Sequence, residues 1–236
     1  MKQILLICAA VVLLGCGKKA PEQQANVPDV NPPVQPPVKE SKKSPAKPKV
    51  ELTEATLTPG IEAALKAHEA GNYREAVRLY TVELAAEEAK PVPSWEQLSY
   101  LHNGLGRALD YAGLYDKALE HHQKALAIYL KQLGSEHPDV ATSYNNIGLV
   151  HDNKGEYDKA LEHYQKALAI DLKKLGPEHP DVAISYNNMA YVYKAKKDLP
   201  KAKEYWEKAY AIYLKKLGSN HPYTKGTKAE LDALKE

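Results

Sequence analysis

A block of residues returns every 42 positions in this 236-residue chain, and this period constrains the fold more than any other feature. The segment 137–146 reads HPDVATSYNN, the segment 179–188 reads HPDVAISYNN, and His221-Pro222 opens another copy. Looking back one period, 116–121 matches 158–163, and a diverged unit lies further upstream. A fixed period of this size is typical of small identical units that stack, because one unit alone cannot bury its apolar face.

Each period is predicted to form two helices. Pro138 suits the first turn of a helix, where its missing N–H is not needed, and this helix is expected to end at Asn153 or Lys154. Gly155 follows, and glycine alone enters the left-handed conformation that ends helices without steric penalty. A second helix is expected from Tyr157 to the Leu175-Gly176 stop, with apolar residues at helical spacing. No segment shows the two-residue alternation of a strand, so the chain is predicted to be all-α.

Small residues let the two helices approach closely. Gly148 lies in the first helix, and Ala160 and Ala167 lie in the second. The pattern resembles the tetratricopeptide repeat, in its 42-residue kinesin light chain type. The family's signature positions are Tyr144, Ile147, Gly148, His151, Gly155, Tyr157, Ala160, Tyr164 and Ala167. The next unit departs from the pattern, because Lys197 and Leu199 replace the glycine and tyrosine of the turn.

The resemblance implies a right-handed α-solenoid of antiparallel helix pairs over residues 58–236. Its expected parts are a diverged unit at 58–94, units at 95–136, 137–178 and 179–220, and a C-terminal capping helix at 221–236.

The N-terminus predicts export. Residues 1–15 read as a lipoprotein signal peptide, because a short apolar run follows Lys2. The stretch Leu13-Leu14-Gly15-Cys16 is similar to the bacterial lipobox, which implies cleavage before Cys16 and lipidation of that residue. The absence of aspartate after Cys16 resembles outer-membrane sorting, so the expected location is the periplasmic face of an outer membrane. An uncleaved anchor or an ordinary secretory signal is the alternative.

Residues 16–57 are predicted to be the lipidated cysteine and a disordered, proline-rich linker. Eight of the 16 prolines fall between residues 17 and 57, with almost no large apolar residue to build a core. Beyond residue 57 the chain has 24 basic and 25 acidic groups, since eight of 32 and five of 30 lie before it. This balance argues against nucleic acid as a partner.

In proteins that the chain resembles, the first helix of each pair lines the concave face. The residues expected to bind a protein or peptide there are Tyr100, Asn103, Arg107, Asp110, Thr142, Asn145, Leu149, Asp152, Ile184, Asn187, Tyr191 and Lys194. An asparagine amide both donates and accepts hydrogen bonds, so Asn103, Asn145 and Asn187 are predicted to form a ladder along an extended peptide. The alternatives are that Asn146 and Asn188 bond to the neighbouring helix pair, that the Ser-Tyr-Asn-Asn string persists because it came with the repeat, or that the convex surface binds.

Catalysis, a cofactor and a metal site are not expected. The chain lacks a nucleophile elbow, a glycine-rich phosphate loop, a zinc-binding helix motif and a cysteine cluster. The recurring His137, His179 and His221 are expected to cap helices rather than share an ion. The sequence therefore predicts a membrane-anchored, non-catalytic adaptor in the bacterial envelope. The alternatives are a structural or self-assembling envelope component, and a small-ligand receptor or enzyme.

Overall fold

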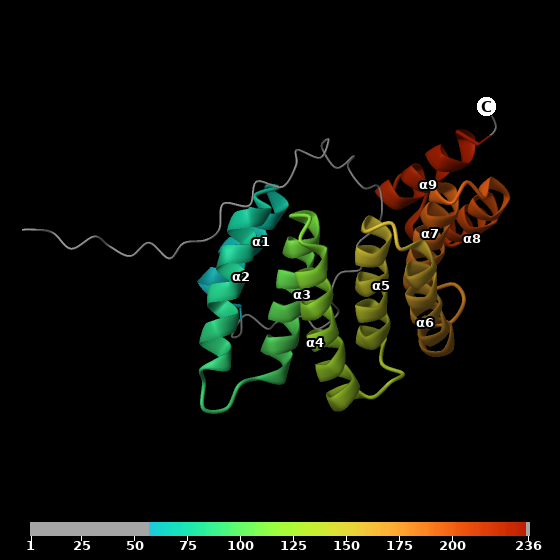
Figure 1. Ribbon diagram of the computed structural model, residues 1–236. Coiled ribbons are helices and arrows are strands. Elements are labelled where there is room, and N and C mark those ends of the chain that lie inside the picture. The colour runs from blue at the N-terminus through green and yellow to red at the C-terminus, as the bar shows by residue number, and fades with distance from the viewer. Residues whose placement is uncertain (1–56, 235–236) are drawn as a thin grey trace, which may run out of the picture. The chain divides into compact units, whose positions relative to one another are not determined.

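The computed structural model describes residues 57–234, and every regular element in this range is an α-helix. The helices are α1 (Pro59–Glu69), α2 (Tyr73–Glu88), α3 (Trp95–Tyr111), α4 (Tyr115–Leu133), α5 (Pro138–Asn153), α6 (Tyr157–Leu175), α7 (Pro180–Ala195), α8 (Leu199–Leu217) and α9 (Pro222–Asp232). Consecutive helices pack side by side as antiparallel pairs, as Figure 1 shows. The predicted all-α solenoid is thus confirmed, whereas the predicted signal peptide, lipidated Cys16 and linker lie outside the described residues. Within residues 57–234, no helix is both long and apolar enough to cross a bilayer.

The ends of the helices follow from local sequence. Each recurring histidine caps a helix: Nδ1 of His137, of His179 and of His221 accepts a hydrogen bond from the backbone N–H two residues on, at 3.2 Å each. The capping interpretation of these histidines is therefore confirmed. At the other end, Gly155 has φ +79°. Lys197, at the equivalent place one unit later, is held at φ 63°, a conformation that costs a side-chain-bearing residue roughly 1–2 kcal/mol.

The core of each pair depends on a close approach of the two helices. A Cβ atom added to Gly148 would lie 2.7 Å from Cε1 of Tyr164, and one added to Gly106 would lie 2.8 Å from Cε1 of His122. Tyr164 is fully buried, and so are Ala160 and Ala167 beside it. The small residues singled out in the sequence therefore let an aromatic ring of the second helix lie close against the backbone of the first.

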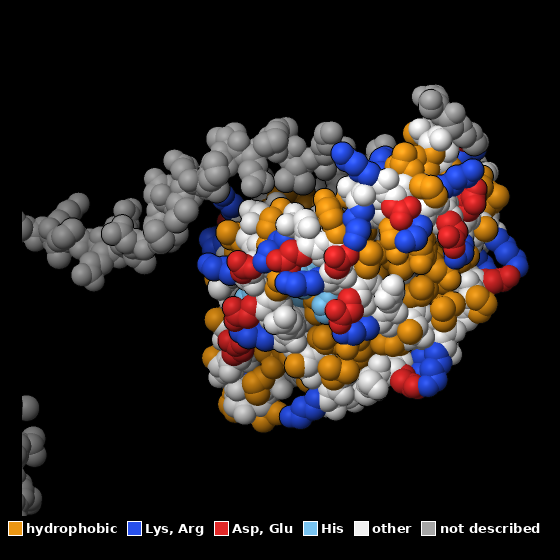
Figure 2. Space-filling view, turned by 45° about the vertical axis from the view of Figure 1, so that its right-hand side comes forward, with side chains coloured by type: hydrophobic (Ala, Val, Ile, Leu, Met, Phe, Trp, Pro, Cys, Tyr) orange, Lys and Arg blue, Asp and Glu red, His pale blue; other side chains and the backbone are white. Residues whose placement is uncertain are grey.

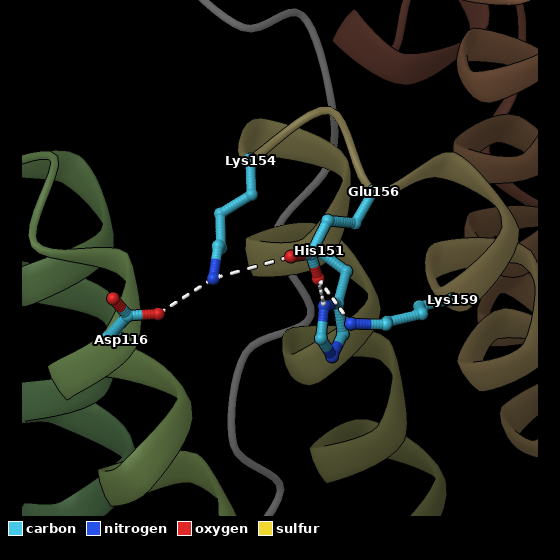
Figure 3. Close-up of polar contacts among 5 residues, drawn as sticks. All are labelled: Asp116, His151, Lys154, Glu156 and Lys159. Carbon is cyan, nitrogen blue, oxygen red and sulfur yellow. Dashed lines mark hydrogen bonds and ion pairs between the residues drawn. The ribbon is translucent and has the colours of Figure 1, made fainter.

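Ion pairs recur between neighbouring pairs with the period of the sequence. Lys154, just after α5, contacts Asp116 of α4 at 2.7 Å and Glu156, the residue before α6, at 3.5 Å (Figure 3). Glu156 also accepts hydrogen bonds from His151 at 2.7 Å and Lys159 at 3.1 Å, and these bonds lower the pKa of its carboxyl to about 2.

One period later Lys196 pairs with Asp158 in the same way. Lys173 and Lys174 likewise pair with Glu136, as Lys215 and Lys216 do with Glu178. Their repetition marks these charges as part of the stacking between units rather than as a functional site, and exposed pairs of this kind contribute up to about 1 kcal/mol each.

Candidate partner-binding face

The first helices of the pairs form the inner layer of the solenoid. Besides its neighbours in sequence, α3 contacts α5, and α5 contacts α7. A stack whose first helices approach one another is curved toward that side, so α3, α5 and α7 line the concave face. The twelve residues expected to bind a partner all lie on these three helices.

The twelve residues differ in their exposure. Tyr100, Arg107 and Tyr191 are half-buried, and Lys194 is exposed. The other eight are buried: Asn103, Asp110, Thr142, Asn145, Leu149, Asp152, Ile184 and Asn187. Of the twelve residues, these four aromatic and basic side chains are therefore the most accessible to a partner.

The three asparagines are hydrogen-bonded within the protein. Asn145 exchanges hydrogen bonds with the Ser185 hydroxyl of the next unit, with both contacts at 3.2 Å. Asn187 accepts one from Thr227 of α9 at 3.4 Å. Asn103 instead donates to the Tyr129 hydroxyl at 3.3 Å, and its Oδ1 lies 3.1 Å from Nδ1 of His122. These amides hold helices together, and their role in binding a partner stays a prediction. The neighbouring asparagines do not behave as expected: within residues 57–234 both amide atoms of Asn146, and Oδ1 of Asn188, are buried without a hydrogen-bond partner.

Replacing Asn145 with alanine is expected to lower the free energy of unfolding by about 1–3 kcal/mol. The Ser185 hydroxyl, which is fully buried, would keep its desolvation penalty and lose its partner. Urea unfolding followed by circular dichroism measures the loss. The double variant Asn145→Ala, Ser185→Ala should recover part of it, because both polar groups are then removed; a strictly additive double variant would contradict the coupling.

The C-terminal end of the face is closed by the last helix. Glu230 of α9 pairs with Lys194 at 2.6 Å and accepts a hydrogen bond from the Tyr191 hydroxyl at 3.3 Å. The Lys194 ammonium also lies 5.5 Å from the centre of the Trp206 ring. Burial, together with the nearby Glu230, raises the pKa of Tyr191. The two C-terminal candidate residues that remain accessible are therefore already engaged by this protein's own capping helix.

The N-terminal end of the face includes residues that the sequence analysis missed. Leu65 and His68 of α1 stand 42 positions before Arg107 and Asp110, so the period itself was the signal that could have identified them. Burial and the nearby Arg107 lower the pKa of His68 to about 4, so its imidazole is neutral near pH 7. The diverged first unit thus also contributes residues to this end of the face.

The chemistry of this face suits recognition. Figure 2 shows basic and acidic side chains interspersed over one side of the molecule, with hydrophobic side chains between them, so this side carries no large excess of one charge. Over residues 57–234 no three His, Cys, Asp or Glu side chains are grouped so that they could hold a metal ion. What the first helices offer on their accessible side is aromatic and basic groups along the stack, an arrangement that can bind an extended chain.

The comparisons agree with this geometry. The tetratricopeptide repeat model matches residues 96–173 and 153–215, which together span just over half of the chain. The structure is similar to BtubC (BKLC) from P. vanneervenii, with 26% identity and a TM-score of 0.62 over 72% of this chain and 68% of that one. It is also similar to a putative kinesin light chain from Podosopora anserina with nearly identical repeats, with 29% identity and a TM-score of 0.61 over 78% and 87%. No curated protein matches the chain.

Proposed function

Because the chain belongs to the tetratricopeptide repeat family, we propose that it is a non-catalytic adaptor that binds a protein or peptide on its concave face. The observation that carries this proposal is the alignment of α3, α5 and α7 along one side of the stack. Three first helices side by side form an elongated surface, which matches an extended peptide better than it matches a compact small molecule.

The proposed mechanism is geometric. Stacking fixes the first helices before any partner arrives, through the buried Asn145–Ser185 contact and the Lys154–Asp116 pair between units. The entropy cost of ordering therefore falls mainly on the partner. Because the adaptor itself loses little conformational entropy, a modest number of contacts is enough for binding. Arg107 and Tyr100 are the accessible charged and aromatic groups at the N-terminal end of the face, so they supply selectivity.

We further propose that the adaptor is anchored to a bacterial membrane through lipid on Cys16. The proposed location is the periplasmic face of the outer membrane. The lipobox-like Leu13-Leu14-Gly15-Cys16 supports this proposal. More than one acyl chain would make the attachment stable, whereas a single chain binds only marginally. The proline-rich segment after Cys16 would then act as a spacer, reaching on the order of 100 Å at about 3.1 Å per residue.

Crosslinking in cells tests both parts of the proposal. A photo-crosslinker at Tyr100 should trap one defined protein, whereas the same group at Val82, an exposed side chain on α2, should not. Replacing Cys16 with alanine should move the protein from the membrane fraction to the soluble fraction and reduce this trapping. Equal trapping from both positions would contradict a concave site, and unchanged fractionation of the Cys16→Ala variant would contradict lipid anchoring.

A further inference from the structure

The turn between α7 and α8 differs in charge from the equivalent turns of the other units. Residues 194–203 include five lysines and one aspartate, a net charge of +4. The segments one, two and three periods earlier are 152–161, with two basic and three acidic groups, and 110–119 and 68–77, with one and two each. All three therefore have a net charge of −1, with histidine counted as neutral. The last turn is a basic projection on a stack whose charges are otherwise nearly balanced.

Ion pairs compensate the lysines of this turn only in part, and all five lysines are exposed. Three of them have a close acidic partner: Lys194 with Glu230, Lys196 with Asp158, and Lys201 with Asp198. Lys203 lies 3.9 Å from Glu207, and within residues 57–234 Lys197 makes no ion pair. Exposed pairs are weak, so these lysines can exchange their acidic partners for other anions.

Two residues of this turn depart from the repeat pattern without helping the fold. Leu199 is 48% exposed, whereas Tyr115 and Tyr157, at the same place in earlier units, pack against the core. Lys197 stands where the other units have glycine, and among residues 57–234 it alone has a positive φ without being glycine. Residues held in such costly conformations are concentrated at functional sites. An exposed leucine and a strained lysine side by side therefore point to a role outside folding.

We propose that this basic turn, made of Lys196, Lys197, Leu199, Lys201 and Lys203, docks on an anionic membrane surface. Lysine ammonium groups attract the phosphates of acidic lipids, and an apolar side chain between them enters the boundary between headgroups and acyl chains. An acidic protein would match the lysines but would offer no apolar layer for Leu199. The combination of charge and exposed leucine therefore favours a bilayer.

Docking of this kind orients the protein rather than attaching it. One leucine and a few lysines bind a bilayer weakly, so the contact adds to an existing anchor. The proposal rests on the membrane location proposed above and not on the adaptor function. The turn lies at an edge of the stack, where α7 ends and α8 begins (Figure 1), and not on the face formed by α3, α5 and α7. A docked solenoid therefore keeps that face open to a partner.

Photo-crosslinking to lipid tests the proposal on the full-length chain. The chain is reconstituted into vesicles of phosphatidylcholine alone, or with about one third phosphatidylglycerol, and both contain the same trace of photoreactive phosphatidylcholine. Labelling of residues 196–203, located by mass spectrometry, should be at least about fivefold stronger in the anionic vesicles. The difference should vanish at about 1 M salt, where the Debye length is about 3 Å. Residues 154–161 are the internal reference, and equal labelling of 196–203 in both vesicles would overturn the proposal.

A double variant that restores the repeat pattern assigns the effect to this turn. Lys197→Gly with Leu199→Tyr introduces the residues that the unit at 137–178 has, and it should lower the labelling in anionic vesicles at least about threefold. Its Tm should not fall, because glycine takes the left-handed conformation without strain, so misfolding would not explain the loss. Lys159→Gln, one period before Lys201, is the matched control and should change nothing. Full labelling of the double variant, or a loss in Lys159→Gln, would overturn the assignment.

This outcome is distinguishable from those for the adaptor function and the anchor. The vesicles contain no protein partner, so a negative result leaves the adaptor function in place. Flotation of the chain with the vesicles measures attachment separately from labelling. A chain that floats without charge-dependent labelling of 196–203 is attached but does not dock through the basic turn, whereas a chain that does not float overturns both the docking and the membrane location.

Discussion

Replacing Gly148 with leucine should lower the free energy of unfolding by about 3 kcal/mol, as judged from the midpoint and slope of urea unfolding. Even a Cβ at this position would lie 2.7 Å from Cε1 and 2.8 Å from Cδ1 of Tyr164. Neither side can move away, because the Tyr164 ring is fully buried and belongs to a helix that packs against α5. The helix propensity gained on replacing glycine, about 1 kcal/mol, offsets only part of this loss.

Alanine at two glycines provides the matched control. Gly226 also lies inside a helix, α9, but a Cβ there meets no atom within 4 Å. Gly226→Ala is therefore expected to stabilise the protein by about 0.5–1 kcal/mol, whereas Gly148→Ala destabilises it. In the unit at 179–220, Ala190 stands at the position of Gly148 and Trp206 at the position of Tyr164, and both are fully buried. If both alanine variants were more stable than the wild type, the close approach would not limit this core.

The sequence predicted the helices well because their ends depend on local residues. The histidine and proline at the start of α5 and the glycine after it act within one turn of the helix, so their effect did not require knowledge of the rest of the fold. Lys197 shows that the turn geometry belongs to the repeat, since the lysine takes the left-handed conformation of the glycine it replaces. Periodicity therefore predicted both the number and the type of elements.

The candidate face was predicted in part. Its helices could be named from the repeat pattern, but the burial of its residues depends on how closely one unit packs on the next. The bond between Asn145 and Ser185 joins residues 40 positions apart, so it depends on how two units pack and not on local sequence. Likewise, the Tyr80 ring lies close against Gly104 of α3, a contact that the sequence did not predict because Tyr80 belongs to a diverged unit where the repeat signature is weak.

Acidification from pH 7.5 to pH 5 should reduce the free energy of unfolding by on the order of 4 kcal/mol, because several histidines are buried in their neutral form. Burial lowers the pKa of His122 to about 3, with smaller effects of Arg107 and His121. Burial also lowers the pKa values of His102 and His163 to about 4.

Because these pKa values are depressed in the folded state, the unfolded chain binds more protons between about pH 6.5 and about pH 3. Stability is therefore complete above pH 6.5 and falls as the pH decreases through this window. A histidine that stays neutral in the folded state contributes about 2 kcal/mol of this loss at pH 5, and the partly exposed imidazoles contribute less because solvent screens them. The depressed pKa values of Glu136 and Glu156, each about 2, act below pH 4.5, so the window from pH 7.5 to pH 5 isolates the histidines.

Two reciprocal variants assign the effect to one position. His122 lies against Gly106 as Tyr164 lies against Gly148, one period apart, so each site has the space for the other's residue. His122→Tyr should reduce the loss between pH 7.5 and pH 5 by about 2 kcal/mol, and Tyr164→His should increase it by a similar amount. Urea unfolding of the wild type and both variants at the two pH values gives the three differences. A pH dependence that is the same in all three proteins would show that these buried rings do not control acid stability. Opposite changes in the two variants would show that the pH dependence arises where the two helices of a pair come closest.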